Sequence, residues 1–309
     1  MRFCIKQRCS PLGCGLRVAL GLAWVLHIAP VLAAENPVAD GYVGPPGRLR
    51  IVEAQVGSVP SDLKALLRFP VEHWSETRMG LLAVGGLILL DKPLTTAWQD
   101  HVQTTLDGFR LPRSPLNALG VHNIGVEDGW LLTGIGATYL VGVFTDDPKA
   151  QETGILAVKA AAYSVLVSQL VLKSLIGRGR PVDSLSTQVS GGGMTTNPFD
   201  FGHLHAPHLG SGGTSSALPS YHCTLFFSVA TVYSRAHDDA LWPYGLAAIG
   251  LASNIRGHHH WVSDMTAGAL IGTAIGRVVT RNHVDGQGKW VVSPYVDADS
   301  RGLQLSYRF

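Results

Sequence analysis

Residues 253–280 read SNIRGHHHWVSDMTAGALIGTAIGRVVT, a polar, histidine-rich stretch that leads into an apolar segment of helical length. Within the apolar segment, glycine recurs at every fourth position, at Gly268, Gly272 and Gly276. Residues four apart share one face of a helix, and a face made of glycines lets another backbone approach closely. The stretch therefore predicts a helix that packs tightly against a neighbour.

Apolar runs of helical length fill most of the remaining chain, and strand-like alternation is confined to its end. We expect helices at 61–76, 79–90, 94–106, 129–145, 151–176, 222–235, 244–255 and 263–280. The first should break or kink at Pro70. Two strands, at 290–296 and 303–309, flank a polar turn and predict a hairpin. The expected fold class is all-α, a helical bundle with a short C-terminal β-hairpin.

The N-terminus has the composition of a secretory leader. A basic start precedes the apolar run Val18–Leu32, which is too short to span a membrane comfortably and is followed by small residues suited to cleavage. We expect a signal peptide over 1–34, with an uncleaved anchor as the alternative. Behind it we expect an extended arm at 35–60, a helical domain at 61–285 and the hairpin at 286–309.

The leader changes what charge and cysteine content imply. The chain carries 24 Lys and Arg against 22 Asp and Glu, and four of the basic residues lie in the leader. The remainder lacks the strong basic excess of a nucleic-acid-binding surface, so we expect no nucleic-acid partner. All cysteines except Cys223 also lie in the leader, which excludes a disulfide framework or a cysteine-rich zinc site in the rest of the chain.

The sequence leaves open whether the helices lie in water or in lipid. The runs 129–145 and 240–255 rise only about 24 Å each, against a hydrocarbon core of about 30 Å. The run 151–176 is longer, but Lys159 interrupts it. Short, interrupted runs favour a soluble or peripherally attached bundle. An integral membrane protein is the alternative, because tilting accommodates short spans.

His260 and Asp264 form the sharpest local pattern of reactive side chains. They lie four residues apart, so on a helix they would share one face. The carboxylate can then hold the proton on imidazole Nδ1 and leave Nε2 free to attack phosphorus. In isolation, a plain surface His–Asp pair is the favoured interpretation of this pattern.

The segment KSLIGRGRP, at 173–181, supplies positive charge. Lys173 stands near the end of a long apolar helix, and Arg180 precedes Pro181, which places it on the turn that leaves the helix. A point charge and a planar fork of donors suit two sides of one phosphate. Alone, the segment also fits basic residues that complement a helix dipole.

The segment PSYH, at 219–222, precedes another apolar helix. Ser220 is suited to cap that helix, and the exposed amides of a first turn form an anion site. His222 would stand at the mouth of this site, where a protonated imidazole can give its proton to a leaving oxygen.

In this order and spacing, the three segments resemble the signature of the type 2 phosphatidic acid phosphatase superfamily, which includes bacterial class A acid phosphatases and vanadium haloperoxidases. The resemblance covers roughly the second half of the chain. It implies a helical bundle around the site, and hydrolysis through a covalent phosphohistidine with no metal and no other cofactor. The roles it implies are phosphate binding by Lys173, Arg180, Ser220 and Tyr221, general acid catalysis by His222, and nucleophilic attack by His260 oriented by Asp264.

Two positions depart from the family pattern, which has Gly at 221 and Arg at 254. Tyr221 places a large ring beside the phosphate cradle, and Asn254 puts a neutral amide where a charged phosphate ligand is expected. Losing an ionic hydrogen bond of about 1.5–3 kcal/mol would slow the reaction by roughly one to two orders of magnitude. Arg178 and Arg256 are the candidate substitutes, although a shift of two residues turns a helical side chain by about 200°.

We therefore expect an exported phosphatase of the bacterial cell envelope that acts on a phosphomonoester or on a lipid or isoprenoid pyrophosphate. Its partner would be a phosphorylated small molecule or lipid, and its apolar helices are compatible with membrane association. One alternative is a catalytically impaired envelope protein that binds a lipid phosphate. The other is a vanadium haloperoxidase, which Asn254 disfavours because it removes a charge that would hold vanadate.

Overall fold

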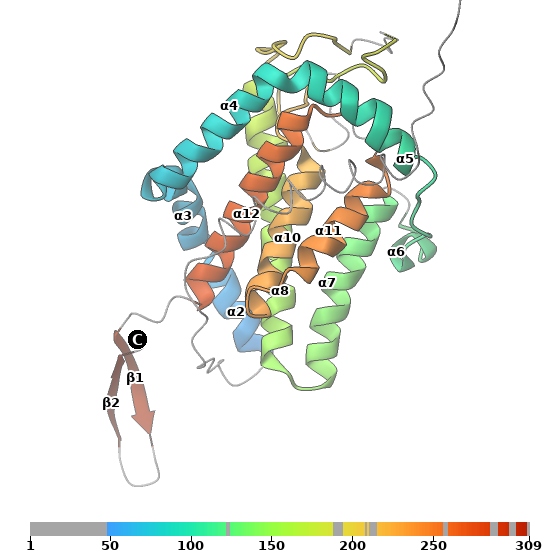
Figure 1. Ribbon diagram of the computed structural model, residues 1–309. Coiled ribbons are helices and arrows are strands. Elements are labelled where there is room, and N and C mark those ends of the chain that lie inside the picture. The colour runs from blue at the N-terminus through green and yellow to red at the C-terminus, as the bar shows by residue number, and fades with distance from the viewer. Residues whose placement is uncertain are drawn as a thin grey trace, which may run out of the picture.

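The computed structural model describes residues 48–121, 124–187, 194–207, 209, 215–255, 259–284, 290–296 and 301–307. The predicted signal peptide at 1–34 and the candidate substitute Arg256 lie outside the described residues. The described part is a helical bundle followed by a two-stranded hairpin, which confirms the predicted all-α class (Figure 1).

The described part begins with helices where an extended arm was predicted. α2 spans Arg48–Gly57 and α3 spans Val59–Glu72, so the prediction of an arm at 35–60 is wrong from residue 48 onward. Proline and glycine in this region suggested a loop, but Pro60 stands in the first turn of α3, where a missing N–H breaks no helical bond. α3 also continues through Pro70, and the chain turns only at His73, which has φ −110° and ψ 47°.

α4 (Trp74–Ala97) runs through Pro93 into the π-helical segment η1 (Trp98–Gln103) and the short α5 (Thr104–Leu106). The two helices predicted at 79–90 and 94–106 are therefore one continuous helical segment. Figure 1 shows this segment arching over the upper end of the bundle. The arch covers the end of the bundle at which the site lies.

Apart from the short α6 (Pro115–Ala118), which was not predicted, the remaining helices follow the predicted pattern to within a few residues. They are α7 (Val126–Phe144), α8 (Pro148–Ser164) with its continuations η2 (Val165–Leu172) and α9 (Lys173–Ile176), α10 (Tyr221–Ala236), α11 (Trp242–Ala252) and α12 (Val262–Val284). The apolar core lies between α7, α8, α10, α11 and α12 and includes Ile135, Leu156, Phe226, Tyr244 and Ile275.

The predicted glycine face of α12 packs against α10. A Cβ at Gly268 would lie 2.5 Å from the carbonyl oxygen of Ser220, and a Cβ at Gly272 would collide with the carbonyl oxygen of Thr224. At the upper end of this contact, the Ser220 N–H donates to the Asp264 carbonyl at 3.0 Å. The close approach thus places the first turns of α10 and α12 side by side, and both carry candidate site residues.

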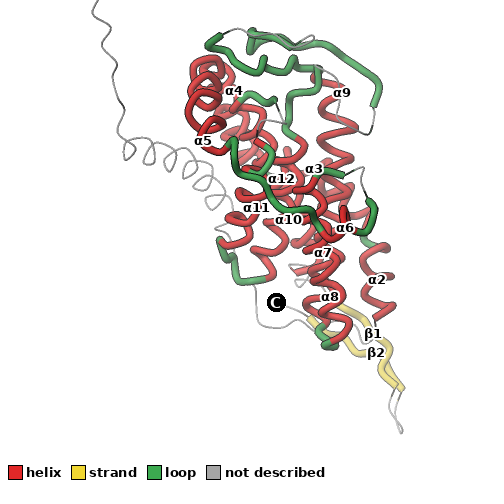
Figure 2. The backbone as a smooth tube through the Cα atoms, turned by 90° about the vertical axis from the view of Figure 1, so that its right-hand side faces the viewer, coloured by secondary structure: helices red, strands yellow, loops and turns green. Residues whose placement is uncertain are grey.

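The C-terminal strands β1 (Trp290–Val296) and β2 (Arg301–Tyr307) pair antiparallel, with Trp290 opposite Tyr307. They match the predicted hairpin, although the second strand begins at Arg301 instead of Leu303. In Figure 2 they lie beyond the lower end of the helices, away from the end that carries the site.

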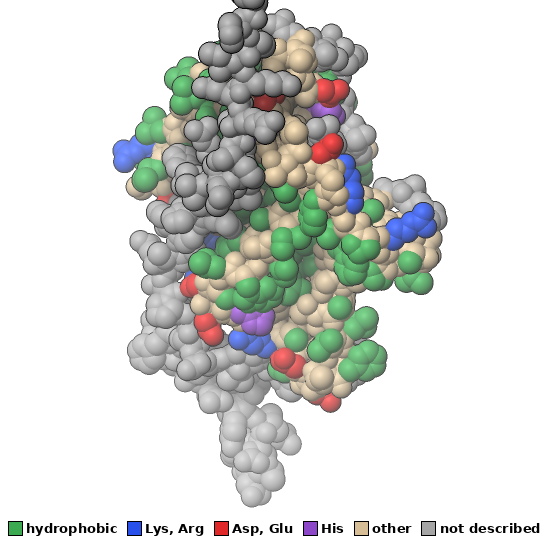
Figure 3. Space-filling model, turned by 45° about the vertical axis from the view of Figure 1, so that its right-hand side comes forward, with side chains coloured by type: hydrophobic (Ala, Val, Ile, Leu, Met, Phe, Trp, Pro, Cys, Tyr) green, Lys and Arg blue, Asp and Glu red, His purple; other side chains and the backbone are tan. Residues whose placement is uncertain are grey.

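Two helical segments are long and apolar enough to cross a membrane, by length and composition alone. They are Trp74–Leu106, with 33 residues, and Pro148–Ile176, with 29 residues. Only 11% of the apolar window of the first is buried inside the protein. Large apolar side chains such as Leu67, Leu82 and Phe144 are more than half exposed, and Figure 3 shows hydrophobic side chains gathered across one face. Such a contiguous apolar surface is typical of a protein that contacts membrane or partners.

Candidate active site

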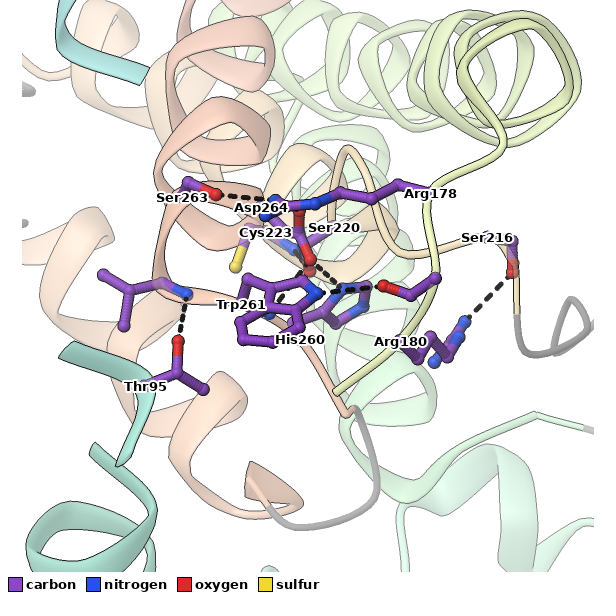
Figure 4. A network of polar contacts seen from close by, with 12 residues as sticks. Thr95, Arg178, Arg180, Ser216, Ser220, Cys223, His260, Trp261, Ser263 and Asp264 are labelled. Atoms are coloured by element: carbon purple, nitrogen blue, oxygen red, sulfur yellow. Dashed lines mark hydrogen bonds and ion pairs between the residues drawn. The ribbon is translucent and has the colours of Figure 1, made fainter. Parts of the chain in front are cut away.

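The His260–Asp264 pair lies at the N-terminal end of α12 (Figure 4). His260 precedes the helix, which begins at Val262, so the two residues do not share a helix face as predicted. The structure still brings them together, because His259 adopts a left-handed backbone with φ 41° and turns the chain into the helix. His260 Nδ1 lies 3.5 Å from Asp264 Oδ2, and both side chains are buried.

Asp264 is surrounded by groups that hold its carboxylate in place. Its Oδ2 accepts a hydrogen bond from the Trp261 backbone N–H at 2.9 Å, and its Oδ1 accepts one from Arg178 Nη1 at 2.6 Å. Burial raises the pKa of Asp264 to about 6, and Arg178 opposes this rise. The carboxylate is therefore poised to be ionised near neutral pH, as an orienter of His260 requires.

The structure places Lys173 and Arg180 close enough for their charges to interact. Lys173 Nζ donates to Gln169 Oε1 at 3.0 Å, and Arg180 Nη2 donates to Ser216 Oγ at 3.3 Å. Burial, and next the charge of Arg180, lowers the pKa of Lys173 to about 7. Burial also lowers the pKa of Arg180. A buried lysine and a partly buried arginine whose charges repel each other form a site that suits an anion.

Ser220 caps α10 as predicted, since its Oγ accepts from the Cys223 N–H at 3.5 Å. Next to it, the Tyr221 ring faces the site: Lys173 Nζ lies 6.0 Å from the ring centroid. The ring also stands edge-on to His222, with centroids 5.1 Å apart. Tyr221 therefore lies beside the cations, where the sequence predicts that a large side chain narrows the pocket.

Two acidic residues from the first turn of α7 also reach the site, and the sequence analysis missed both. Asp128 Oδ2 lies 3.5 Å from His222 Nε2, and Glu127 Oε1 accepts a hydrogen bond from Asn254 Nδ2 at 3.0 Å. Neither acid belongs to one of the three segments. The available signal, two acidic residues at a helix start, is common in helices of every kind.

Arg178 does not substitute for the arginine expected at position 254. An arginine has five N–H donors, and the contacts of Arg178 account for all of its nitrogens. The acceptors are Asp91, Asp264, Ser263 and the Pro198 carbonyl. With these donors engaged and the side chain fully buried, the expectation that Arg178 contacts phosphate is wrong.

Metal-binding side chains form no evident cluster in the part of the chain that the structure describes: no group of three or more His, Cys, Asp or Glu residues there could hold a metal ion. The donor set of the site consists of cationic and imidazole groups, which suits an anionic ligand.

Comparison with known proteins agrees with this arrangement. A model of the PAP2 superfamily matches residues 154–286, the region that contains all three segments. A Lipid A 1-phosphatase of Porphyromonas gingivalis is 26% identical over 126 residues, which cover 37% of this chain and 27% of that protein. No solved structure shows a significant match to the chain.

Proposed function

Because residues 154–286 belong to the PAP2 superfamily, we propose that the protein is a phosphatase that hydrolyses the phosphate ester of a lipid at the site formed by the three segments. The observation that carries the proposal is the meeting of a buried lysine and a partly buried arginine, a capped helix start and a buried His–Asp pair at one end of the bundle. This combination supplies anion binding, a nucleophile and a proton donor.

In the proposed reaction, the Nε2 lone pair of His260 attacks phosphorus while Asp264 holds the Nδ1 proton. The P–O bond to the lipid breaks, and His222 gives a proton to the leaving oxygen. Water then attacks the phosphohistidine, with His222 taking the proton of that water. The cycle releases inorganic phosphate and restores both histidines. Asp128, which lies 3.5 Å from His222, is suited to stabilise the protonated imidazole.

Lys173 and Arg180 would hold the phosphoryl oxygens. Without a ligand, the pKa of Lys173 is lowered to about 7, first by burial and next by Arg180. A bound phosphate places negative charge between the two cations and favours the protonated lysine. Phosphate binding and protonation of Lys173 are therefore expected to be coupled.

A lipid substrate agrees with the surface of the protein and with its relative. Exposed apolar side chains cover α3, α4, α7 and α11, and the similar protein of P. gingivalis is a Lipid A 1-phosphatase. We infer that the protein works at the bacterial cell envelope in contact with membrane lipid. A phosphomonoester and an isoprenoid pyrophosphate both present the terminal phosphate that the site can take.

A second candidate is a protein that binds a lipid phosphate without turning it over. The contact between Asn254 and Glu127 favours this reading, because the residue that stands where the family has a phosphate-binding arginine is a neutral amide that donates to a buried carboxylate. The Tyr221 ring beside Lys173 also favours the non-catalytic candidate, because it narrows the phosphate-binding pocket. A haloperoxidase is disfavoured, because the same missing charge weakens the hold on vanadate.

The direct test is phosphate release by the purified protein in detergent micelles with EDTA. The panel contains phosphatidic acid, phosphatidylglycerol phosphate, undecaprenyl pyrophosphate, lipid A and p-nitrophenyl phosphate. We expect turnover of at least one lipid substrate, and a loss of roughly three orders of magnitude or more in His260→Ala. Folded protein that binds these lipids but releases no phosphate would support the non-catalytic candidate instead.

A further inference from the structure

Arg178 and Asp91 form a buried charge network directly behind the His260–Asp264 pair. Arg178 bridges two carboxylates: Nη1 lies 2.6 Å from Asp264 Oδ1, and Nη2 lies 2.7 Å from Asp91 Oδ2. All three side chains have 0% exposure. The network joins elements far apart in sequence, since Asp91 belongs to α4, Arg178 to the turn after α9 and Asp264 to α12.

Ser263 completes the network and fixes its orientation. The Ser263 N–H donates to Asp91 Oδ1 at 2.9 Å, its hydroxyl donates to Asp91 Oδ2, and the same hydroxyl accepts from Arg178 Nη1 at 2.7 Å. The carbonyl of Pro198 takes the remaining guanidinium donors. Because every donor of Arg178 is engaged, its plane is fixed, and with it the carboxylate of Asp264.

The two oxygens of Asp264 have separate partners. Oδ1 faces Arg178, while Oδ2 faces His260 Nδ1 and the Trp261 N–H. The guanidinium thus holds the carboxylate from the side opposite the histidine (Figure 4). On the basis of the proposed function, we propose that Arg178 and Asp91 are positioning residues for the reaction, which orient Asp264 and set the pH at which it becomes the ionised partner of His260.

The charges around Asp264 shift its pKa in opposite directions. Its pKa is raised to about 6 by burial, the positive charge of Arg178 lowers it, and the negative charge of Asp91 raises it. His260 Nδ1 lies 3.5 Å from Asp264 Oδ2, so the charge of this carboxylate acts directly on the imidazole. The other titratable or charged groups that interact with Asp264 are Lys173 on α9, Arg180 on the following turn and Cys223 on α10.

A network that only fastened α4 to α12 would leave the pH dependence of the reaction unchanged. Breaking such a network would lower stability, and it would lower kcat by a similar factor at every pH. A positioning network predicts opposite shifts for its two ends. Without Arg178 the pKa of Asp264 rises, and without the negative charge of Asp91 it falls.

The test compares pH profiles of kcat for the wild type, Arg178→Gln and Asp91→Asn on the best substrate of the panel. The acidic limb should move upward by about one pH unit in Arg178→Gln and downward in Asp91→Asn. Arg178→Lys keeps the positive charge but loses the planar guanidinium that holds Asp264 in place. It should therefore lower kcat at least about tenfold and move the acidic limb less than Arg178→Gln does. Shifts in one direction for both substitutions, or unmoved limbs with lowered kcat, would overturn the proposal.

Asp62→Asn is the matched control. Asp62 is also fully buried and forms an ion pair with Lys159, 2.5 Å between Oδ2 and Nζ, which links α3 to α8. Its replacement should lower the melting temperature as much as Asp91→Asn does, without moving the acidic limb. If Arg178→Gln does not fold, the downward shift of the acidic limb expected in Asp91→Asn still tests the effect of charge. The fall in kcat expected in Arg178→Lys still tests the positioning role.

A second measurement separates this proposal from the proposed function. In the unliganded protein, ¹⁵N NMR of labelled histidine follows the His260 ring, identified by its absence in His260→Gln. Its titration should shift in opposite directions in Arg178→Gln and Asp91→Asn, whether or not a substrate is turned over. A wild type without phosphatase activity would refute the function alone, and an unshifted His260 titration would refute the positioning role alone.

Discussion

Asn254 shows how a single residue can alter a site whose other groups are in place. Its amide donates to the carboxylate of Glu127, a residue with 4% exposure on the first turn of α7. A buried carboxylate needs a partner, and Asn254 is one that the structure records. The amide at 254 thus has a hydrogen-bond partner on another helix, which no reading of the third segment alone could reveal.

Restoring arginine at 254 is therefore predicted to help only when Glu127 is changed as well. In Asn254→Arg, the guanidinium would pair with Glu127 and not with substrate, so kcat/KM should change less than about threefold. In Asn254→Arg with Glu127→Gln, the arginine is released to the phosphate, and kcat/KM should rise roughly tenfold or more. Steady-state kinetics of both variants, with Glu127→Gln alone as the control, measures these changes in kcat/KM. A gain in kcat/KM as large in the single Asn254→Arg variant as in the double variant would contradict the role given to Glu127.

Lys173 predicts how stability depends on pH. Its pKa in the folded protein is lowered from 10.5 to about 7, by burial first and by Arg180 next. Between these values the unfolded chain binds more protons than the folded protein, so this residue makes stability rise with pH from 7 toward 10. Below pH 7 the buried charge is fully present and destabilises the fold.

We expect the contribution of Lys173 to be visible in melting temperatures. Lys173→Met should raise the melting temperature at pH 6–7 and flatten its increase between pH 7 and 9. Inorganic phosphate should narrow the difference between wild type and variant, because the anion stabilises the charged lysine. A variant whose melting curve runs parallel to that of the wild type across this range would show that Lys173 is not titrating there.

Among the helices, the contact between α10 and α12 determines the geometry of the site. It places the first turn of α10, with Ser220 and His222, next to Asp264, and it depends on glycines without side chains. Of the three glycines on this face of α12, Gly272 has the least room for a side chain. A Cβ there would collide with the carbonyl oxygen of Thr224, a backbone atom that cannot rotate away.

Gly272→Ala is therefore predicted to push the two helices apart. We expect a loss of about 1–3 kcal/mol in unfolding free energy and a fall in kcat, because His222 lies on α10 and His260 immediately precedes α12. Gly245→Ala on α11 is the control: a Cβ there has open space, and alanine should stabilise that helix by about 0.5–1 kcal/mol. Chemical denaturation measures the unfolding free energy of both variants, and steady-state kinetics measures their kcat. Equal stability of Gly272→Ala and Gly245→Ala would contradict the tight packing inferred at Gly272.

At the level of elements, apolar runs and glycine spacing predicted most of the helices and the tight α12 contact. The failures have physical causes. The predicted arm extended to Pro60, and a kink was predicted at Pro70, but Pro60 stands in the first turn of α3 and this helix continues through Pro70. His260 was expected on the helix and lies before it, yet the left-handed backbone at His259 keeps the pair together. Contacts made by Asp91 and Glu127 depend on tertiary packing, which no local pattern encodes.

Over the whole molecule, the proposed site and the apolar surface are both compatible with a lipid substrate. The candidate site residues come from the segments at which α8–α9 ends and α10 and α12 begin, and these segments lie at the upper end of the bundle in Figure 1. Exposed apolar side chains cover the outer helices. This arrangement suits a lipid whose chains remain in an apolar phase while its phosphate enters a charged, polar site.

The central claim is a covalent phosphohistidine at His260, and trapping the intermediate tests it most directly. The protein would be mixed with ³²P-labelled phosphatidic acid, or with the best substrate of the panel, and quenched within milliseconds in alkali, in which phosphohistidine survives. The account predicts label on the peptide that contains His260, none in His260→Ala, and more label in His222→Ala when a substrate with a good leaving group is used. Turnover without label, or label on another residue, would contradict it.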